Sequence, residues 1–390
     1  MIKLLTEQGT AFARSADGED MADDCAVSIV LSTYNRAALL GPAIDRLSDQ
    51  ALGTPPCELV IVDNNSTDDT RAVVEHRMAQ SRLPLQYVFE PRQGLSYARN
   101  AGIAVARADL VAFTDDDVRV APDWVTVIKM TFDAHPDVDC LGGRSLPVWP
   151  SQPPPWLTRR HWVGPLALQD YGDLPFIVDA RRTLCLAGAN LAFRKRVFDD
   201  IGWFSPDFPN SEDTELMLRF WVSGARALYV PDMVVHAEVQ PERLTKRYHR
   251  MWHSRIGRCN ARMFLAEMTA PGGSLRPTIP EFPRILGIPL FVVRQLGGEI
   301  FHWFVHTMRR RPAEAVWHEV MARALVGHIR ESAAMHRRRK SRTQESPQPR
   351  ERRMAPAPRL REERYDDERA PIDCDRFGRR RPAVSRTVDG

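Results

Sequence analysis

Three consecutive aspartates, Asp115, Asp116 and Asp117, follow the apolar run 110–114. Adjacent carboxylates repel one another, so a triplet at the end of a buried strand requires a compensating cation. Residues 115 and 117 alternate and can address one divalent ion, and carboxylate oxygens suit Mg²⁺ or Mn²⁺. On these residues alone, a solvated acidic turn explains the triplet equally well.

A further carboxylate, Asp63, ends the apolar run 58–62. The residues after it contain Ser66 and Asp69, which form an S-x-x-D capping box for the next helix. Capping explains Ser66 and Asp69 without any ligand, but it does not explain a carboxylate directly after a buried strand. Asp63 there can accept hydrogen bonds from the base or the ribose of a nucleotide.

Three other sites carry residues that can do chemistry. Glu212 and Asp213 begin an amphipathic pattern, where acidic residues are favoured by the helix N-terminus and where one of them can also act as a general base. His236 follows a short apolar run and is either a structural imidazole or a ligand. Arg99 lies on a predicted helix and contacts either a phosphate or solvent.

The elements that position these residues form an alternating pattern over residues 26–115. Short apolar runs that alternate with helical patterns predict a parallel sheet covered on both faces, which is the α/β class. In such sheets ligands bind at the carboxyl ends of the strands, where Asp63 and the triplet lie. Strands are expected at 26–31, 58–62, 85–89 and 110–114, with helices at 37–52, 66–79 and 96–106.

The second half has a less regular pattern. Residues 147–162 contain five prolines and three tryptophans and predict a loop. Beyond it we expect short strands at 188–193, 227–230 and 233–236, and helices at 213–223, 244–268, 285–308 and 312–335. The predicted organisation is a flexible segment 1–24, an α/β domain 25–240, a helical region 241–335 and a disordered Arg-rich tail 336–390.

The charge is unevenly distributed. The chain has 54 Lys and Arg against 50 Asp and Glu, but residues 331–390 hold 17 against 11, which leaves 37 against 39 for the rest. Because the tail mixes both signs and has few aromatic residues, no nucleic acid is expected as a partner.

The six cysteines have no C-x-x-C spacing and no histidine at ligand spacing, which predicts neither a zinc site nor a disulfide framework. Residues 1–24 lack an apolar signal segment, so we expect a cytoplasmic protein.

The apolar segment 285–308 raises the question of membrane contact. It contains Arg294 and Glu299, which are costly at the centre of a bilayer, and it ends at the basic run 309–311. An in-plane amphipathic helix on anionic lipid at the inner face of the cell membrane is one interpretation. A helix buried in the globular body is the other.

Taken together, five segments resemble the inverting glycosyltransferases of family 2, which have the GT-A fold. The segments match in order and spacing over about residues 26–240, and they read VSIVLSTYNR (27–36), ELVIVDNNSTDDT (58–70), GLSYARNAGIAVARADLVAFTDDDV (94–118), GANLAFRKRVFDDIGWF (188–204) and SEDTELMLRFWVSGARALYVPDMVVH (211–236). The resemblance implies a Rossmann-like, mixed and mostly parallel sheet flanked by helices, followed here by a helical extension and a tail.

The resemblance also assigns site residues. It implies that Asp213 is the catalytic base and that Asp115 and Asp117 hold Mn²⁺ or Mg²⁺, with His236 as a further ligand. It places Thr33, Asp63, Arg99, Asp115 and Asp116 on the side of the nucleotide-sugar donor, a UDP- or GDP-sugar. It implies transfer of a hexose with inversion to a glycan or lipid-linked sugar acceptor, as in the synthesis of cell-envelope polysaccharides.

One departure from the family limits this expectation. Processive synthases carry Q-x-x-R-W after the base, whereas residues 246–252 read KRYHRMW, so we expect one sugar to be added per encounter. Two alternatives remain. The first is a sugar nucleotidyltransferase of the same fold, which is disfavoured because no Gly-rich phosphate loop follows the first strand. The second is a non-catalytic protein that binds anionic membrane or RNA through its basic tail.

Overall fold

The computed structural model describes residues 4–5, 11–14, 25–51 and 55–345. Within these residues, eleven strands form one sheet, in the order β1-β2-β5-β4-β3-β6-β10-β8-β11-β7 with β9 paired to β11. The strands are β1 (Leu4–Leu5), β2 (Ala11–Arg14), β3 (Val27–Thr33), β4 (Cys57–Asp63), β5 (Leu85–Phe89), β6 (Leu110–Asp115), β7 (Val118–Val120), β8 (Cys140–Val148), β9 (Phe176–Val178), β10 (Leu191–Arg194) and β11 (Ala227–Glu238). Seven of the eleven run in one direction, because only β2, β7, β9 and β10 run against the others. The predicted mixed, mostly parallel sheet is confirmed.

The parallel core β5-β4-β3-β6 consists of the four strands predicted from the first 115 residues. In its register Thr33 is opposite Asp63, and Ser32 is opposite Asp115. These residues are the last ones of β3, β4 and β6, so three polar strand ends meet at one edge of the sheet.

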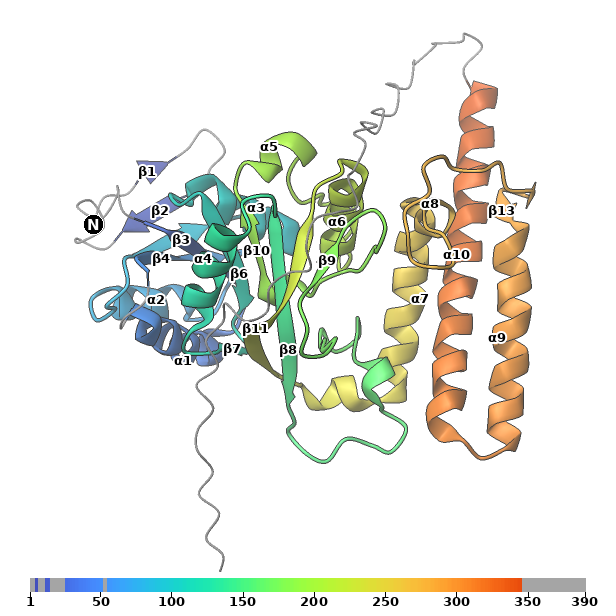
Figure 1. Cartoon of the computed structure of the whole chain (residues 1–390), viewed down its shortest axis with the longest axis horizontal. Coiled ribbons are helices and arrows are strands. Elements are labelled where there is room, and N and C mark those ends of the chain that lie inside the picture. The colour runs from blue at the N-terminus through green and yellow to red at the C-terminus, as the bar shows by residue number, and fades with distance from the viewer. Residues whose placement is uncertain (1–3, 6–10, 15–24, 52–54, 346–390) are drawn as a thin grey trace, which may run out of the picture. The chain divides into compact units, whose positions relative to one another are not determined.

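Helices cover both faces of this core, as the alternating pattern predicts (Figure 1). One apolar cluster joins the sheet to α1 (Ala37–Ser48), α2 (Thr70–Met78) and α4 (Trp124–Ala134). The other joins it to α3 (Leu95–Val105), α5 (Val197–Ile201) and α6 (Glu212–Val222). Side chains alternate between the two clusters along each strand: Ile29 and Leu31 belong to the first and Val30 to the second.

In the second half of the chain, the strands and helices are joined and divided differently from the prediction. The two short strands expected at 227–236 are one strand, β11, with an irregularity between Val230 and Val234. The helix expected at 244–268 is divided into α7 (Lys246–Arg262) and α8 (Leu265–Met268) at Phe264, which has a positive φ of 54°.

The C-terminal region is a group of long helices. α10 (Pro312–Glu345) lies between α7 and α9 (Leu290–Met308) (Figure 1). It continues to Glu345, ten residues beyond the expected end of the helical region, and residues 346–390 of the expected tail lie outside the described residues. At the other end, β1 and β2 fall within the segment 1–24 that was expected to be flexible.

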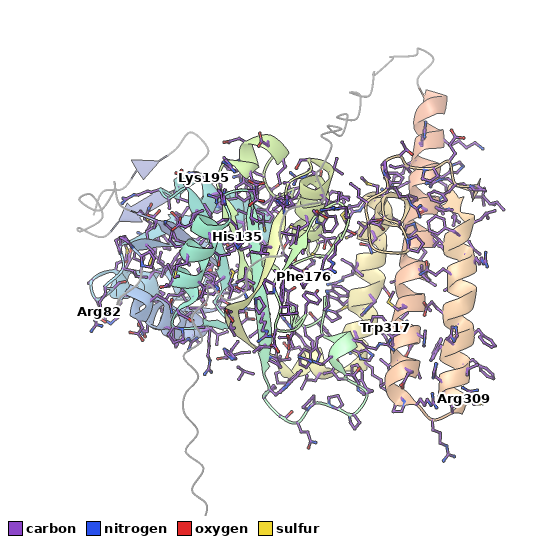
Figure 2. The ribbon with its side chains drawn as sticks, viewed as in Figure 1. Arg82, His135, Phe176, Lys195, Arg309 and Trp317 are labelled. Carbon is purple, nitrogen blue, oxygen red and sulfur yellow. The ribbon has the colours of Figure 1, made fainter. Side chains whose placement is uncertain are left out.

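The loop 147–162 packs against α10. Trp317 of α10 is labelled in Figure 2. Its ring centroid lies 5.7 Å from that of His161, and the Arg160 guanidinium lies 4.8 Å from the centre of the Trp317 ring. A short 3₁₀ turn, Arg159–His161, is the regular element that the sequence pattern did not predict in this loop.

α9 leaves a long apolar stripe uncovered. Val292 is its buried residue, whereas Ile300, Phe301, Phe304 and Met308 are between 48% and 66% exposed. Phe301, Phe304 and Met308 are spaced by three and four residues and Ile300 lies four residues before Phe304, which places them on one side of the helix. Within the described part of the chain, no helix is both long enough and apolar enough to span a bilayer.

Candidate active site

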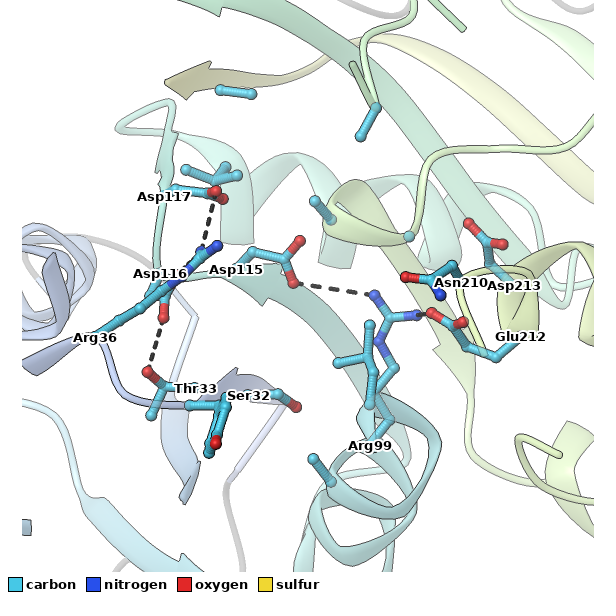
Figure 3. A pocket seen from close by; sticks show the side chains of 18 of the residues that line it. Ser32, Thr33, Arg36, Arg99, Asp115, Asp116, Asp117, Asn210, Glu212 and Asp213 are labelled. Atoms are coloured by element: carbon cyan, nitrogen blue, oxygen red, sulfur yellow. Dashed lines mark hydrogen bonds and ion pairs between the residues drawn. The ribbon is translucent and has the colours of Figure 1, made fainter. Parts of the chain in front are cut away.

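A cavity of about 500 Å³ opens at the carboxyl edge of the parallel strands. The aspartate triplet lies on one side of it, and Glu212 and Asp213 of α6 lie on the other (Figure 3). The residues that line it come from β3, α3, the turn after β6, the loop 164–167, the N-terminus of α6, the end of β11 and α7. Asn64, Gly188 and Ala189 also line it, so the cavity joins all five segments that resemble the family.

Arg99 connects the two sides of the cavity (Figure 3). Its Nη2 lies 3.9 Å from Asp115 Oδ1, and its Nη1 lies 3.4 Å from Glu212 Oε1. The guanidinium is 4% exposed and stacks against the rings of Phe113 and Phe204. Arg99 was predicted to contact the nucleotide-sugar donor. In the structure it is a buried cation between two carboxylates.

The turn before α3 holds Arg99 in this place. Gly94, with φ of +141°, begins the turn, and its amide donates to Asn64 Oδ1 at 2.7 Å. A Cβ on Gly188 would lie 2.7 Å from Arg99 Nη2, so the guanidinium needs the space that this glycine leaves.

Asp115 has an unusual acidity for an aspartate. Its pKa is raised to about 6, mainly by burial, with repulsion from Asp117 and Asp116 adding to the rise and Arg99 opposing it. A carboxylate held under this repulsion is stabilised by any additional cation at the same place. Its 3.9 Å approach to Arg99 is too long for a hydrogen bond, so its oxygens remain available for a ligand.

The other two aspartates are held by neighbouring side chains. Asp116 accepts hydrogen bonds from Thr33 Oγ1 and Arg36 Nη1, both at 2.7 Å. Asp117 Oδ2 accepts from Gln240 Nε2 at 2.6 Å and from Arg36 at 3.1 Å. Thr33, expected on the donor side, therefore lines the cavity and orients Asp116.

The two acidic residues of α6 have different surroundings. Glu212 is buried, and burial raises its pKa, with Asp213 adding to the rise and Arg99 opposing it. Asp213 is partly exposed to the cavity, and its Oδ1 accepts from the amide of Thr214 at 2.7 Å. In the described part of the chain no cation lies within ion-pair distance of Asp213, which leaves it able to accept a proton.

The far side of the cavity comes from the loop 164–167 and α7. Tyr248 and Trp252 of α7 line the cavity, and Trp252 packs against Gly164, where a Cβ would meet its ring at 2.3 Å. Arg243 also lines the cavity, and among the described residues it has no ion-pair partner.

Two predicted site residues do not line the cavity. Asp63 is buried, its Oδ1 accepts from the Ser66 amide at 2.8 Å and its Oδ2 from Tyr87 Oη at 2.7 Å. Its neighbour Asn64 lines the cavity instead.

His236 is the other predicted site residue outside the cavity. It is exposed on β11, because successive side chains of a strand point to opposite faces and Val235 and Ala237 are the buried ones. His236 therefore does not line the cavity as Asp115 and Asp117 do, and its role as a further metal ligand stays a prediction.

Several residues of the site were not predicted. Arg36 lies in the segment 27–36, three residues after the end of β3, and a basic residue close to a strand end could have pointed to it. Glu212 was considered as a helix-start residue or a general base, and its ion pair with Arg99 was not predicted because the two residues are 113 positions apart. No local pattern points from Trp252 to the cavity, because α7 belongs to a different part of the sequence.

The carboxylate set fits a divalent metal of the Mg²⁺ or Mn²⁺ kind. Asp115 and Asp117 supply hard oxygen ligands from one turn, and Asp115 is repelled by both neighbouring aspartates as well as attracted by Arg99. No sulfur or imidazole ligand lines the cavity among the described residues, which disfavours zinc and copper there.

The sequence of this chain is similar to the sequences of known glycosyltransferases. Residues 28–202 match the model of the family described as glycosyl transferase family 2. The chain is 33% identical over 220 residues to validoxylamine A glucosyltransferase of Streptomyces hygroscopicus subsp. jinggangensis, which covers 51% of this chain and 52% of the relative. It is 27% identical over 182 residues to glucosyl-dolichyl phosphate glucuronosyltransferase of Haloferax volcanii, covering 46% and 55%. The chain thus spans about half the length of these curated relatives.

Solved structures with a similar arrangement were also found. The mannosyltransferase PcManGT of Pyrobaculum calidifontis in complex with GDP-Man and Mn²⁺ has 21% identity and a TM-score of 0.48, covering 81% of this chain and 75% of that one. S. aureus TarS 1-349 in complex with UDP has 17% identity and a TM-score of 0.46, covering 80% and 91%.

Proposed function

Because this chain belongs to glycosyl transferase family 2 through residues 28–202, we propose that it transfers one hexose from a UDP- or GDP-sugar to an acceptor hydroxyl, with inversion and with Mn²⁺ or Mg²⁺ bound. The observation that carries the proposal is the arrangement around Arg99. It ties the strand-end aspartates to the α6 carboxylates across one cavity of a size that suits a nucleotide-sugar.

The donor occupies the side of the cavity at the strand ends. Asp115 and Asp117 would hold the ion, which when bound offsets the negative charge that develops on the departing diphosphate. Thr33 and Arg36 keep Asp116 oriented between them, at 2.7 Å each. Arg243, a cation on the cavity wall, would contact the diphosphate directly.

Asp213 is the proposed base. It takes the proton from the acceptor hydroxyl as the hydroxyl oxygen bonds to the anomeric carbon and the bond from that carbon to the diphosphate oxygen breaks. Since one displacement accomplishes the transfer, the product has the inverted configuration. Glu212 is less suited to this role because it is buried against Arg99.

The acceptor enters beside the loop 164–167 and α7. Tyr248 and Trp252 give this side an aromatic surface, and aromatic faces pack well against sugar rings. The loop 147–162 and α10 lie next to this side, so these segments would set which acceptor is used. No processive motif follows Asp213, which favours a single addition.

We further propose a lipid-linked acceptor, glycan acceptors being the alternative, and peripheral binding to the inner face of the cell membrane. The exposed stripe of Phe301, Phe304 and their neighbours on α9 carries this proposal, because it ends at three consecutive arginines that would face anionic headgroups. The name of the Haloferax relative, which refers to a dolichyl phosphate sugar, is consistent with such an acceptor.

A donor screen tests the proposed function. The full-length protein is incubated with a panel of UDP- and GDP-sugars and either Mn²⁺ or Mg²⁺, and release of the nucleoside diphosphate is measured. We expect metal-dependent release from at least one donor, and its loss in Asp115→Ala. Asp109→Ala, an exposed aspartate outside the cavity, is the matched control. Absence of release from every donor with either metal would refute the proposal.

A further inference from the structure

Three histidines gather where α9 and α10 meet. His302 and His306 are four residues apart on α9, and His318 lies near the start of α10. One ring nitrogen of each lies within 4.8 Å of the other two. The His318 ring stacks against both partners, with ring centroids 5.1 Å from His302 and 5.2 Å from His306.

A carboxylate holds one of these rings in an orientation suited to a metal. His318 Nδ1 lies 2.7 Å from Glu299 Oε2, so the carboxylate fixes this nitrogen as the hydrogen-bonding one and leaves Nε2 free for a ligand. Metal-binding histidines usually have such a carboxylate partner. Glu299 lies three residues before His302, on the same side of α9.

A second observation also points to a ligand. His306 Nδ1 is buried, and the described residues provide no hydrogen-bond partner for it. A buried polar nitrogen without a partner is costly, and a metal ion between the three rings would remove that cost. The His302 ring is on the exposed side of the cluster, which leaves a path for an ion to enter.

We propose that His302, His306 and His318 bind one transition-metal ion of the Zn²⁺ class, and that Glu299 positions His318. Imidazole nitrogens suit Zn²⁺, Co²⁺ and Ni²⁺, whereas Mg²⁺ and Mn²⁺ suit the carboxylates of the cavity. The cluster shares no residue with that cavity. The ion would fasten α9, the helix with the exposed apolar stripe, to α10.

This site contradicts the expectation from sequence that there is no zinc site. That expectation considered cysteine spacing. The H-x-x-x-H spacing of 302–306 places two imidazoles on one face of a helix, but the third ligand comes from the next helix, which only the fold brings close.

Co²⁺ titration of the metal-stripped full-length protein tests the site, with excess Mg²⁺ present to occupy the carboxylate cavity. We expect one equivalent of Co²⁺ to give an intense visible absorption, which oxygen-ligated Co²⁺ does not give, and Zn²⁺ to abolish it. Zn²⁺ should also raise the melting temperature.

Variants decide between the outcomes. His302→Ala, His306→Ala and His318→Ala should each lose the absorption and the thermal shift, and Glu299→Gln should weaken Co²⁺ binding by about 10–100-fold. His76→Ala, an exposed histidine on α2, is the control and should behave as the wild type. Lack of the absorption in the wild type, or its retention in all three cluster variants, would overturn the proposal. Neither result depends on glycosyl transfer, so this test is independent of the donor screen.

Discussion

Arg99 and Glu212 form a buried ion pair, with 3.4 Å between Nη1 and Oε1 and with both side chains at most 6% exposed. The pair joins α3 to the first turn of α6, and the same guanidinium faces Asp115. The relative placement of the proposed donor and acceptor sides therefore depends on one buried cation.

Removing that cation should destabilise the fold. Arg99→Met leaves Glu212 buried without a partner, and breaking a buried pair from one side costs about 3–5 kcal/mol. Arg99→Met/Glu212→Gln should lose less, because the stranded charge is gone. Urea unfolding measures both values. Arg71→Ala, which removes an exposed pair with Glu75, is the control and should cost less than about 1 kcal/mol. A double variant as unstable as the single one would contradict the assigned role of Glu212.

Metal binding should depend on pH through Asp115. Because its pKa is raised to about 6, protons compete with the ion below that pH and not above it. We expect Mn²⁺ affinity, measured by calorimetry, to be level above pH 7 and to fall by about tenfold per unit below pH 6. Asp115→Asn should bind weakly at every pH, and Asp109→Asn should follow the wild type. A flat wild-type profile down to pH 5 would contradict the raised pKa, and Asp115→Asn binding Mn²⁺ as tightly as the wild type would show that Asp115 is not a ligand.

The diphosphate contact of Arg243 gives a separate prediction. Arg243→Gln should weaken binding of the nucleotide-sugar by about tenfold or more, since a charge-assisted hydrogen bond contributes about 1.5–3 kcal/mol. Arg247→Gln removes a neighbouring exposed charge that does not line the cavity and is the control. Equal losses in the two variants would indicate a general effect of charge and not a contact.

The aromatic side chains of α7 that line the cavity should affect binding of the acceptor and not of the donor. Trp252→Ala should raise the KM for the acceptor by about tenfold or more while donor hydrolysis stays unchanged. Met251→Ala, an exposed neighbour outside the cavity, is the control. Loss of donor hydrolysis in Trp252→Ala would place this side chain at the donor.

Membrane binding should depend on the α9 stripe. The wild type should float with anionic liposomes at low salt, and Phe301→Asp/Phe304→Asp should stay in the soluble fraction because two charged groups replace the apolar contact. Met130→Asp, at an equally exposed position of α4, should float like the wild type. Flotation of the double variant would exclude the stripe as the contact.

The sequence was sufficient to predict the part of the fold that local patterns control. The strand 85–89 was predicted with its observed limits, and the ends of the other parallel strands differ by at most two residues, because buried parallel strands are short apolar runs between helices. The meeting of Thr33 with Asp116, and of Asp115 with the end of β3, follows from that topology. β8 and α4 were missed because the pattern between 118 and 148 has no clear period.

The remaining features depend on contacts between distant segments. Arg99 pairs with Glu212, and the Trp252 ring fills the space over Gly164, because the sheet and α7 bring together residues that are about a hundred positions apart. The position of His236 outside the cavity lining has a related reason. Its alternation on β11 depends on the irregularity between Val230 and Val234, which shifts the register relative to β8.

The most direct test of the proposed mechanism measures sugar transfer by Asp213→Asn with a donor from the screen. The change removes the proton acceptor and keeps the size of the side chain. We predict a fall in kcat of about 10²–10⁴-fold, with donor affinity within about twofold of the wild type. Glu215→Gln, on the same helix and paired with Arg219, is the control. Transfer by Asp213→Asn at the rate of the wild type would contradict the account.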